Sequence, residues 1–161
     1  MNGDALVIGI GNDFRGDDGV GLAVAAALAD HRTAGVRVIT TAGDPTTVID
    51  AWRGVGLVIV VDAALGDVAV SGRLRRWVPA EPAGPAEVSS HGLGLLQAYA
   101  LGEALGNLPD RLVVFTVDIA EAALGIGLSP PVAAAVPRCV SAVLTEVRAR
   151  PGRDRTETVD R

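Results

Sequence analysis

The first sixty residues alternate between short apolar runs and segments of helical character, and this alternation constrains the fold more than any other feature. Apolar or β-branched runs lie at residues 5–10, 36–41 and 57–61, and helical segments at 19–31 and 46–53 separate them. A β-α-β-α-β order implies a parallel sheet with right-handed crossovers. The first run hardly alternates, which is typical of a strand buried on both faces.

The second half of the chain adds two strands and two helices to this α/β fold class. Residues 73–78 alternate polar and apolar residues, which predicts an edge strand, and the short connection before it favours an antiparallel direction. We predict a helix at 91–105, a strand at 112–117 and a last helix ending near residue 148. Pro137 lies inside that helix and predicts a kink or two joined segments.

The length fits one domain, which we place at residues 1–149. Residues 118–128 form a looser stretch before the last helix. Residues 150–161 are charged and poor in apolar residues, so we expect a disordered tail there.

Composition excludes several classes of function. A net charge of −5 argues against a nucleic-acid partner, and the one basic cluster (Arg73, Arg75 and Arg76) indicates an exposed strand face. No run approaches ~18 apolar residues, so we expect no membrane span. We see no signal peptide, and the single cysteine, Cys139, fits a small buried residue of a cytoplasmic protein.

The loop after the first strand combines glycines with polar side chains. Residues 11–19 include Asn12, Asp13, Asp17 and Asp18. An acid at a helix start offsets the helix dipole, which accounts for one carboxylate but not for the whole group. Ligands of open α/β sheets bind at the carboxyl ends of the strands, so we interpret this loop as one wall of an active site.

Three potential ligands are expected at this edge of the sheet. Asp18 lies in the first loop, Asp62 follows the third strand, and His91 begins a helix. Two carboxylates and an imidazole could hold a divalent metal with open positions. Each residue also has a plain structural explanation, because Asp18 could pair with the helix dipole, Asp62 could cap a loop and His91 could be a surface histidine.

Other catalytic and binding motifs are incomplete or missing. The run G-I-G at residues 9–11 lacks the third glycine of the dinucleotide fingerprint, and the acidic loop would repel pyrophosphate. The sequence has no phosphate-binding G-x-x-x-x-G-K-[ST] motif, and neither H-E-x-x-H nor G-x-S-x-G occurs. A small-molecule hydrolase or nucleotide-binding module is therefore a weaker hypothesis.

Four motifs in order resemble a known family. They are G-I-G-N-D-F-R-G-D-D-G-V-G at 9–21, D-A at 62–63, S-H-G-L-G-L at 90–95 and G-I-G-L-S-P at 125–130. Together they resemble the hydrogenase maturation endopeptidases, which trim the carboxyl-terminal extension from the large subunit of nickel–iron hydrogenases. The resemblance covers roughly residues 5–148.

The resemblance implies a fold, a site and a substrate. The fold would be a three-layer α/β/α sandwich with a mostly parallel, twisted sheet of about five strands. Asp18, Asp62 and His91 would bind nickel and carry the catalysis of an aspartic-type endopeptidase. The nickel would belong to the hydrogenase large-subunit precursor and signal that metal insertion is complete, and no organic cofactor is implied.

Two questions remain open from the sequence. The same three ligands would serve a non-catalytic chaperone that recognises the metal-loaded subunit without cutting it. In addition, the family usually has Thr after the glycine that follows the second strand, whereas this chain has Asp44 after Gly43. The additional carboxylate could alter the choice of subunit or contribute to catalysis.

Overall fold

The computed structural model describes residues 4–66, 68–79, 90–122 and 124–150, and the side chains of residues 90–93 lie outside the description. Within these ranges the chain forms five strands, four α-helices and one short 3₁₀ helix. In chain order they are β1 (Ala5–Ile10), η1 (Gly16–Gly19), α1 (Val20–His31), β2 (Val36–Thr41), α2 (Pro45–Trp52), β3 (Leu57–Leu65), β4 (Leu74–Trp77), α3 (Ser90–Leu105), β5 (Arg111–Ile119) and α4 (Pro130–Arg148).

The strands form one sheet in the order β2-β1-β3-β5-β4. The pairs β1–β2, β1–β3 and β3–β5 are parallel, and β4 runs antiparallel to β5 at the edge. This confirms the predicted parallel sheet and the antiparallel edge strand. It also brings the carboxyl ends of β1 and β3 side by side.

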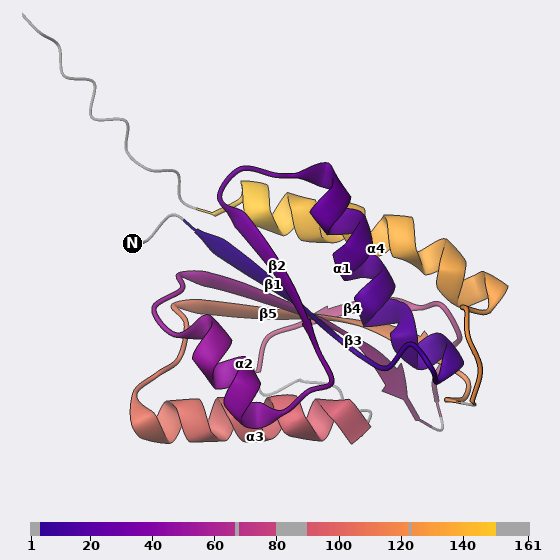
Figure 1. Ribbon diagram of the computed structural model, residues 1–161, viewed down its shortest axis with the longest axis horizontal. Coiled ribbons are helices and arrows are strands. Elements are labelled where there is room, and N and C mark those ends of the chain that lie inside the picture. Colours follow the sequence, from indigo (N-terminus) through magenta and orange to yellow (C-terminus); the bar gives the residue numbers. More distant parts are fainter. Residues whose placement is uncertain (1–3, 67, 80–89, 123, 151–161) are drawn as a thin grey trace, which may run out of the picture.

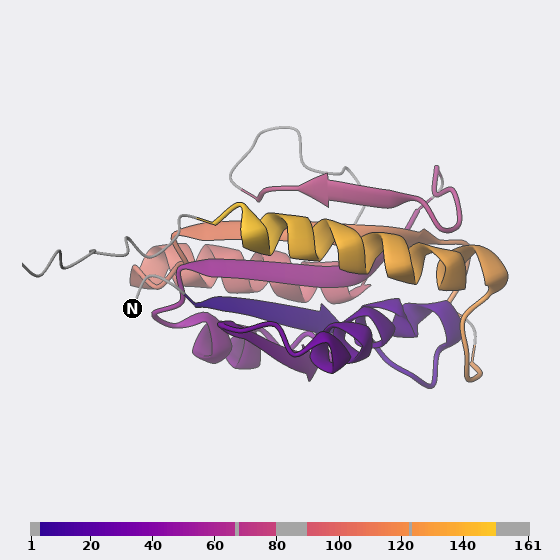
Figure 2. The same cartoon turned by 90° about the horizontal axis from the view of Figure 1, so that it is seen from above.

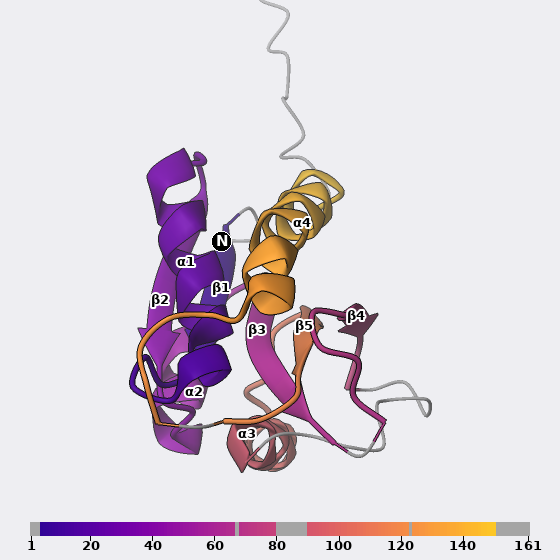
Figure 3. The same cartoon turned by 90° about the vertical axis from the view of Figure 1, so that its right-hand side faces the viewer.

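The sheet is the middle layer of a three-layer α/β/α sandwich, as predicted (Figure 1). Helices α1 and α4 pack together on one face, and α2 and α3 pack together on the other (Figures 1 and 3). Seen from above, the layers extend along the same long axis as the strands (Figure 2). No helix of the described ranges is long and apolar enough to cross a membrane.

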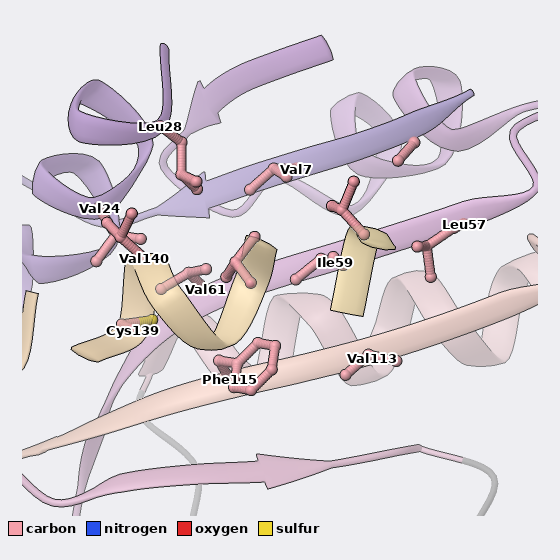
Figure 4. Packing of buried hydrophobic residues seen from close by; sticks show 13 residues of the cluster. Val7, Val24, Leu28, Leu57, Ile59, Val61, Val113, Phe115, Cys139 and Val140 are labelled. Atoms are coloured by element: carbon pink, nitrogen blue, oxygen red, sulfur yellow. The ribbon is translucent and has the colours of Figure 1, made fainter. Parts of the chain in front are cut away.

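Aliphatic side chains fill both halves of the core. On one face, residues of β1, β3 and β5 contact α1 and α4, and Cys139 of α4 lies in this cluster with Phe115 (Figure 4). Burial raises the pKa of the Cys139 thiol to about 12, so the thiol stays protonated at neutral pH. This agrees with the prediction that Cys139 is a small buried residue. All six residues of β1 are buried, as expected for a central parallel strand.

Glycines allow α1 to lie directly on the strands. A Cβ atom at Gly21 would overlap the carbonyl oxygen of Ile10 and lie 2.5 Å from that of Val61, and one at Gly9 would overlap the carbonyl oxygen of Gly21. Only glycine therefore permits this helix–strand contact. The consequence for function is that the start of α1 and the preceding η1 lie against the ends of β1 and β3.

Three element boundaries differ from prediction. Strands β3 and β5 extend to Leu65 and Ile119, because they continue to pair with each other after the β1–β3 pairing ends at Val61. Asp62 therefore lies inside β3 rather than after it. Helix α4 runs through Pro137 as a single helix, so of the two predicted alternatives, a kink or two joined segments, the second is wrong. The expected tail lies outside the described residues from residue 151 on.

The basic cluster is a largely exposed strand face that also forms ion pairs. Arg73 and Arg75 bind the carboxylate of Asp118, and Arg76 binds Glu146 of α4. The side chains of Arg73 and Arg76 are exposed and that of Arg75 is about one-third accessible, in agreement with the predicted exposed face. The ion pairs give the cluster a structural role.

Glu146 provides a test of this ion-pair arrangement. It accepts hydrogen bonds from Arg76 (3.1 and 2.9 Å) and from Arg111 (2.8 Å). The hydrogen bonds from Arg76 hold the pKa of Glu146 below its usual value, although burial opposes them, and the positive charges of both arginines act in the same direction as the bonds.

We expect Glu146→Gln to remove an acid-sensitive part of the stability. Because the folded pKa is the lower one, this contribution is complete above the unfolded pKa of about 4.3 and is lost as pH falls through the folded value. Urea unfolding of both proteins between about pH 7 and 3 should show a difference that shrinks in acid. A difference that is the same at every pH would contradict the assignment.

Candidate active site

The candidate site lies where the parallel strands end. The loop after β1, the carboxyl end of β3 and the amino ends of α2 and α3 gather at one end of the sheet (Figure 1). Figure 3 looks onto this end, and the connection from β5 to α4 crosses it to reach the first loop. The predicted site and the observed edge therefore coincide.

The first loop is ordered by its own polar side chains. The Oδ1 atom of Asn12 accepts a hydrogen bond from the backbone N–H of Phe14 at 2.9 Å, which closes an Asx turn. The chain then enters η1, where Asp18 is 3% exposed. A Cβ at Gly11 would overlap the carbonyl oxygen of Asp18, so the loop folds tightly back on itself. Asp18 is thus held by backbone packing.

Asp17 binds the loop to the start of α4. Its carboxylate accepts hydrogen bonds from the backbone N–H of Ser129 at 2.6 Å and from the Ser129 hydroxyl at 2.7 Å. Ser129 is the N-cap residue of α4, but its hydroxyl donates to Asp17 and does not cap the helix. The sequence motifs at 9–21 and 125–130, more than a hundred residues apart, therefore meet through this contact.

Backbone contacts extend the junction between the two loops. The N–H of Gly16 donates to the carbonyl of Gly125 at 2.9 Å, and the N–H of Gly125 donates to the carbonyl of Phe14 at 3.0 Å. The guanidinium of Arg15 donates to the carbonyl of Ala122 at 3.3 Å. These bonds fix the 124–128 loop beside the loop that carries Asp18.

Asp62 is the first residue of β3 beyond its pairing with β1. It is 2% exposed, and its Oδ1 atom accepts a hydrogen bond from the N–H of Ala63 at 2.8 Å. Side chains alternate along a strand, so Asp62 lies on the face of Val58 and Val60, which α2 and α3 cover. Because the start of α1 lies against Val61, Asp62 and the loop of Asp18 come together at the strand ends.

His91 lies in the first turn of α3, at the same edge of the sheet (Figure 1). Three residues later, a Cβ at Gly94 would overlap the carbonyl oxygen of Gly43, so the first turn of α3 lies against the loop before α2. Positions three apart share a helix face, which places position 91 on the side of α3 that meets this loop. The side chain of His91 lies outside the description.

No group of three His, Cys, Asp or Glu side chains that could hold a metal occurs among those the structure describes. Since the third predicted ligand, His91, is not among them, the set of Asp18, Asp62 and His91 stays a prediction. Two of its members are buried carboxylates at one edge of the sheet.

The additional carboxylate, Asp44, has a structural role. It is the N-cap of α2, and its Oδ1 atom accepts a hydrogen bond from the N–H of Thr46 at 2.8 Å. An N-cap of this kind contributes roughly 1 kcal/mol to helix stability. This contact explains an aspartate here without a catalytic function.

A row of buried polar groups lies beside Asp62 and was not predicted. Thr116 of β5 pairs with Asp62 of β3 and with Arg75 of β4, and Asp118 follows two residues later on the same face. Asp118 is fully buried, and one of its oxygens accepts hydrogen bonds from Val70, Arg73 and Arg75. In the sequence, Asp118 is visible only as an acid at the end of an apolar run, which does not reveal its partners.

Comparison with known proteins agrees with the geometry. The model of the hydrogenase maturation protease family (HycI) matches residues 23–146, a span that includes Asp62 and His91 and begins after Asp18. No match was found among curated proteins.

Solved structures of maturation proteases share the fold over nearly the whole chain. The hydrogenase maturating endopeptidase HybD from E. coli is 25% identical, with a TM-score of 0.76 and coverage of 90% of this chain and 92% of that one. The hydrogenase 2 maturation peptidase from Thaumarchaeota archaeon SCGC_AB-539-E09 is also 25% identical, with a TM-score of 0.67 and coverage of 90% and 98%.

The maturation protease HybD from Thermococcus kodakarensis, at 24% identity, has a TM-score of 0.73 and coverage of 89% and 99%, which supports the fold. Family match and sheet topology lead to the same assignment. This chain belongs to the hydrogenase maturation protease family, and it is an endopeptidase of that family.

Proposed function

We propose that this protein removes the carboxyl-terminal extension of a nickel–iron hydrogenase large-subunit precursor after nickel insertion. The precursor's own nickel is the recognition signal, and Asp18, Asp62 and His91 are the residues that meet it. Carboxylate oxygens and an imidazole nitrogen are suitable ligands for a divalent first-row metal.

The observation that carries the proposal is the pair of buried carboxylates. Asp18 and Asp62 are 3% and 2% exposed, and they come from separate elements that meet at the carboxyl ends of β1 and β3. Ligands of open α/β sheets bind at this edge, and carboxylate oxygens are common ligands of divalent metals, so the place of both residues suits a role toward a bound cation. Negative charge in a partly closed site also favours a cation over an anion.

Metal recognition would place one peptide bond beside these carboxylates. Holding the bond and the attacking water in one place replaces a bimolecular encounter with a local reaction. In the proposed reaction one carboxylate takes a proton from water, and the resulting hydroxide adds to the carbonyl carbon. The carbon–nitrogen bond then breaks, and the proton passes to the departing amine.

The test is the mass of a nickel-loaded large-subunit precursor after incubation with the protein, beside the same precursor without nickel. The expected result is loss of a carboxyl-terminal peptide from the loaded sample alone. Cleavage of both samples would contradict nickel recognition. Binding of the loaded precursor without loss of mass would instead support a metal-dependent chaperone.

A further inference from the structure

An apolar surface lies next to the candidate active site, on the junction between the first loop and the 124–128 loop. Phe14, Leu124 and Ile126 are 70%, 89% and 87% exposed. Among the residues that the structure describes, they are the three most exposed large hydrophobic side chains. The hydrogen bonds between Gly125 and the first loop hold them on one structure, which we name the apolar junction.

A groove runs along the apolar junction. Its volume is about 420 Å³, and its walls are mainly apolar and include Phe14, Ala23, Ile126 and Leu128. Asp13 is the charged side chain that lines it. Pockets that hold small ligands have volumes of about 300–1,000 Å³, so the groove can accept a short apolar stretch of polypeptide but not a folded element.

The backbone of the 124–128 loop presents Ile126 to solvent. Gly125 and Gly127 have φ angles of +150° and +99°, a region that other residues rarely adopt, and open space surrounds both Cα atoms where a side chain would be. A side chain at either position would therefore meet no neighbour, and glycine is needed there only because the loop has positive φ angles. Since Asp17 and Arg15 also anchor the loop at its two ends, Ile126 is exposed on a fixed loop.

The groove and the candidate site share η1. Gly16 and Gly19, the two ends of η1, line the groove, and the buried Asp18 lies between them in the chain. Exposed apolar surface of this kind is typical of a protein–protein contact.

We infer that the apolar junction is a docking surface for the hydrogenase large-subunit precursor, and that its groove takes an apolar segment of the precursor close to the bond that is cut. This inference rests on the proposed function: the groove shares η1 with the candidate active site, so a polypeptide held at that site is the occupant nearest to it. It separates two tasks at one edge of the sheet. The carboxylates recognise the metal and act on the bond, while the apolar junction holds the polypeptide.

The experiment compares Phe14→Ser, Leu124→Ser and Ile126→Ser with wild type and with Leu105→Ser. Leu105 is a matched control, since it is 65% exposed at the far end of α3. Three quantities are measured with nickel-loaded precursor. Kd is measured for each substitution in an Asp62→Asn background that does not cut, and KM and kcat are measured for each substitution in the active protein. Thermal unfolding shows whether each variant is folded.

We expect Ile126→Ser to raise Kd and KM about ten- to a hundredfold, since the variant loses the burial of a large apolar side chain. Values of kcat at saturation should stay within about twofold of wild type, and unfolding temperatures should be unchanged. Leu105→Ser should match wild type throughout. Unchanged Kd and KM for all three junction variants would overturn the docking surface.

The outcomes separate this inference from the proposed function. A protein that binds the precursor through the apolar junction but does not cut it contradicts the proposed function and supports the docking surface. If the protein cuts the precursor and the junction variants have the KM of wild type, the proposed function is supported and the docking surface is contradicted. If the junction variants change a dimer into a monomer and leave KM unaltered, the occupant is a second copy of the chain and the inference is wrong.

Discussion

Replacing Asp62 by asparagine is expected to lower the rate of precursor cleavage by about 10²- to 10⁴-fold and to leave the fold intact. Asparagine has nearly the shape of aspartate and keeps a carbonyl oxygen, which can still accept the hydrogen bond from Ala63. It cannot take a proton from water, and it lacks the negative charge that attracts a metal. The loss should therefore appear in catalysis and not in folding.

The measurement is single-turnover cleavage of nickel-loaded precursor, followed by mass, together with thermal unfolding of the same samples. Asp50→Asn is a suitable control, because Asp50 is an exposed aspartate on α2 whose side chain is 67% accessible. Asp18→Asn and His91→Ala should behave like Asp62→Asn. A folded Asp62→Asn protein that cuts within about tenfold of the wild-type rate would exclude Asp62 from the reaction.

Residue patterns were sufficient to predict the parallel sheet, for a physical reason, and the family resemblance added the three layers. Patterns such as the apolar run at residues 57–61 depend on local chemistry, and right-handed crossovers leave few ways to arrange β-α-β units. The same reasoning brought Asp18 and Asp62 to one edge, because parallel strands end on the same side. The strand order then decides which of these ends are neighbours, and β1 and β3 are adjacent in the sheet.

Long-range polar partners could not be predicted in this way. Nothing local in the sequence indicates that Asp17 binds Ser129, or that Asp118 binds Arg73 and Arg75. A polar residue at the end of an apolar run indicates a strand end, yet Asp118 lies within β5, where it pairs with Ala64 of β3. The ends of β3 and β5 were therefore predicted too early in the chain.

Such partners should matter for stability, and replacing Asp118 by alanine is expected to lower the free energy of unfolding by about 3 kcal/mol. The Asp118 side chain is 1% accessible and binds two arginines at 2.9 Å each and the N–H of Val70 at 3.1 Å. Removing one partner of a buried pair costs about 3–5 kcal/mol, because the other groups lose their compensation. Arg73 and Arg75 are 42% and 34% accessible, so water can take over part of their solvation, which favours the lower value.

Equilibrium unfolding in urea at neutral pH measures this effect, and Glu146→Ala is the matched control. Glu146 also binds two arginines, but its side chain is 12% accessible and lies on the outer helix layer, so its loss should cost about 1 kcal/mol or less. Both variants remove a carboxylate that binds two arginines, and they differ in how deeply that carboxylate is buried. Equal losses for the two variants would show that ion pairing, and not the burial of Asp118, accounts for its contribution. A larger loss for Asp118→Ala means that the polar row beside Asp62 stabilises the edge of the sheet where β3 and β5 extend beyond β1.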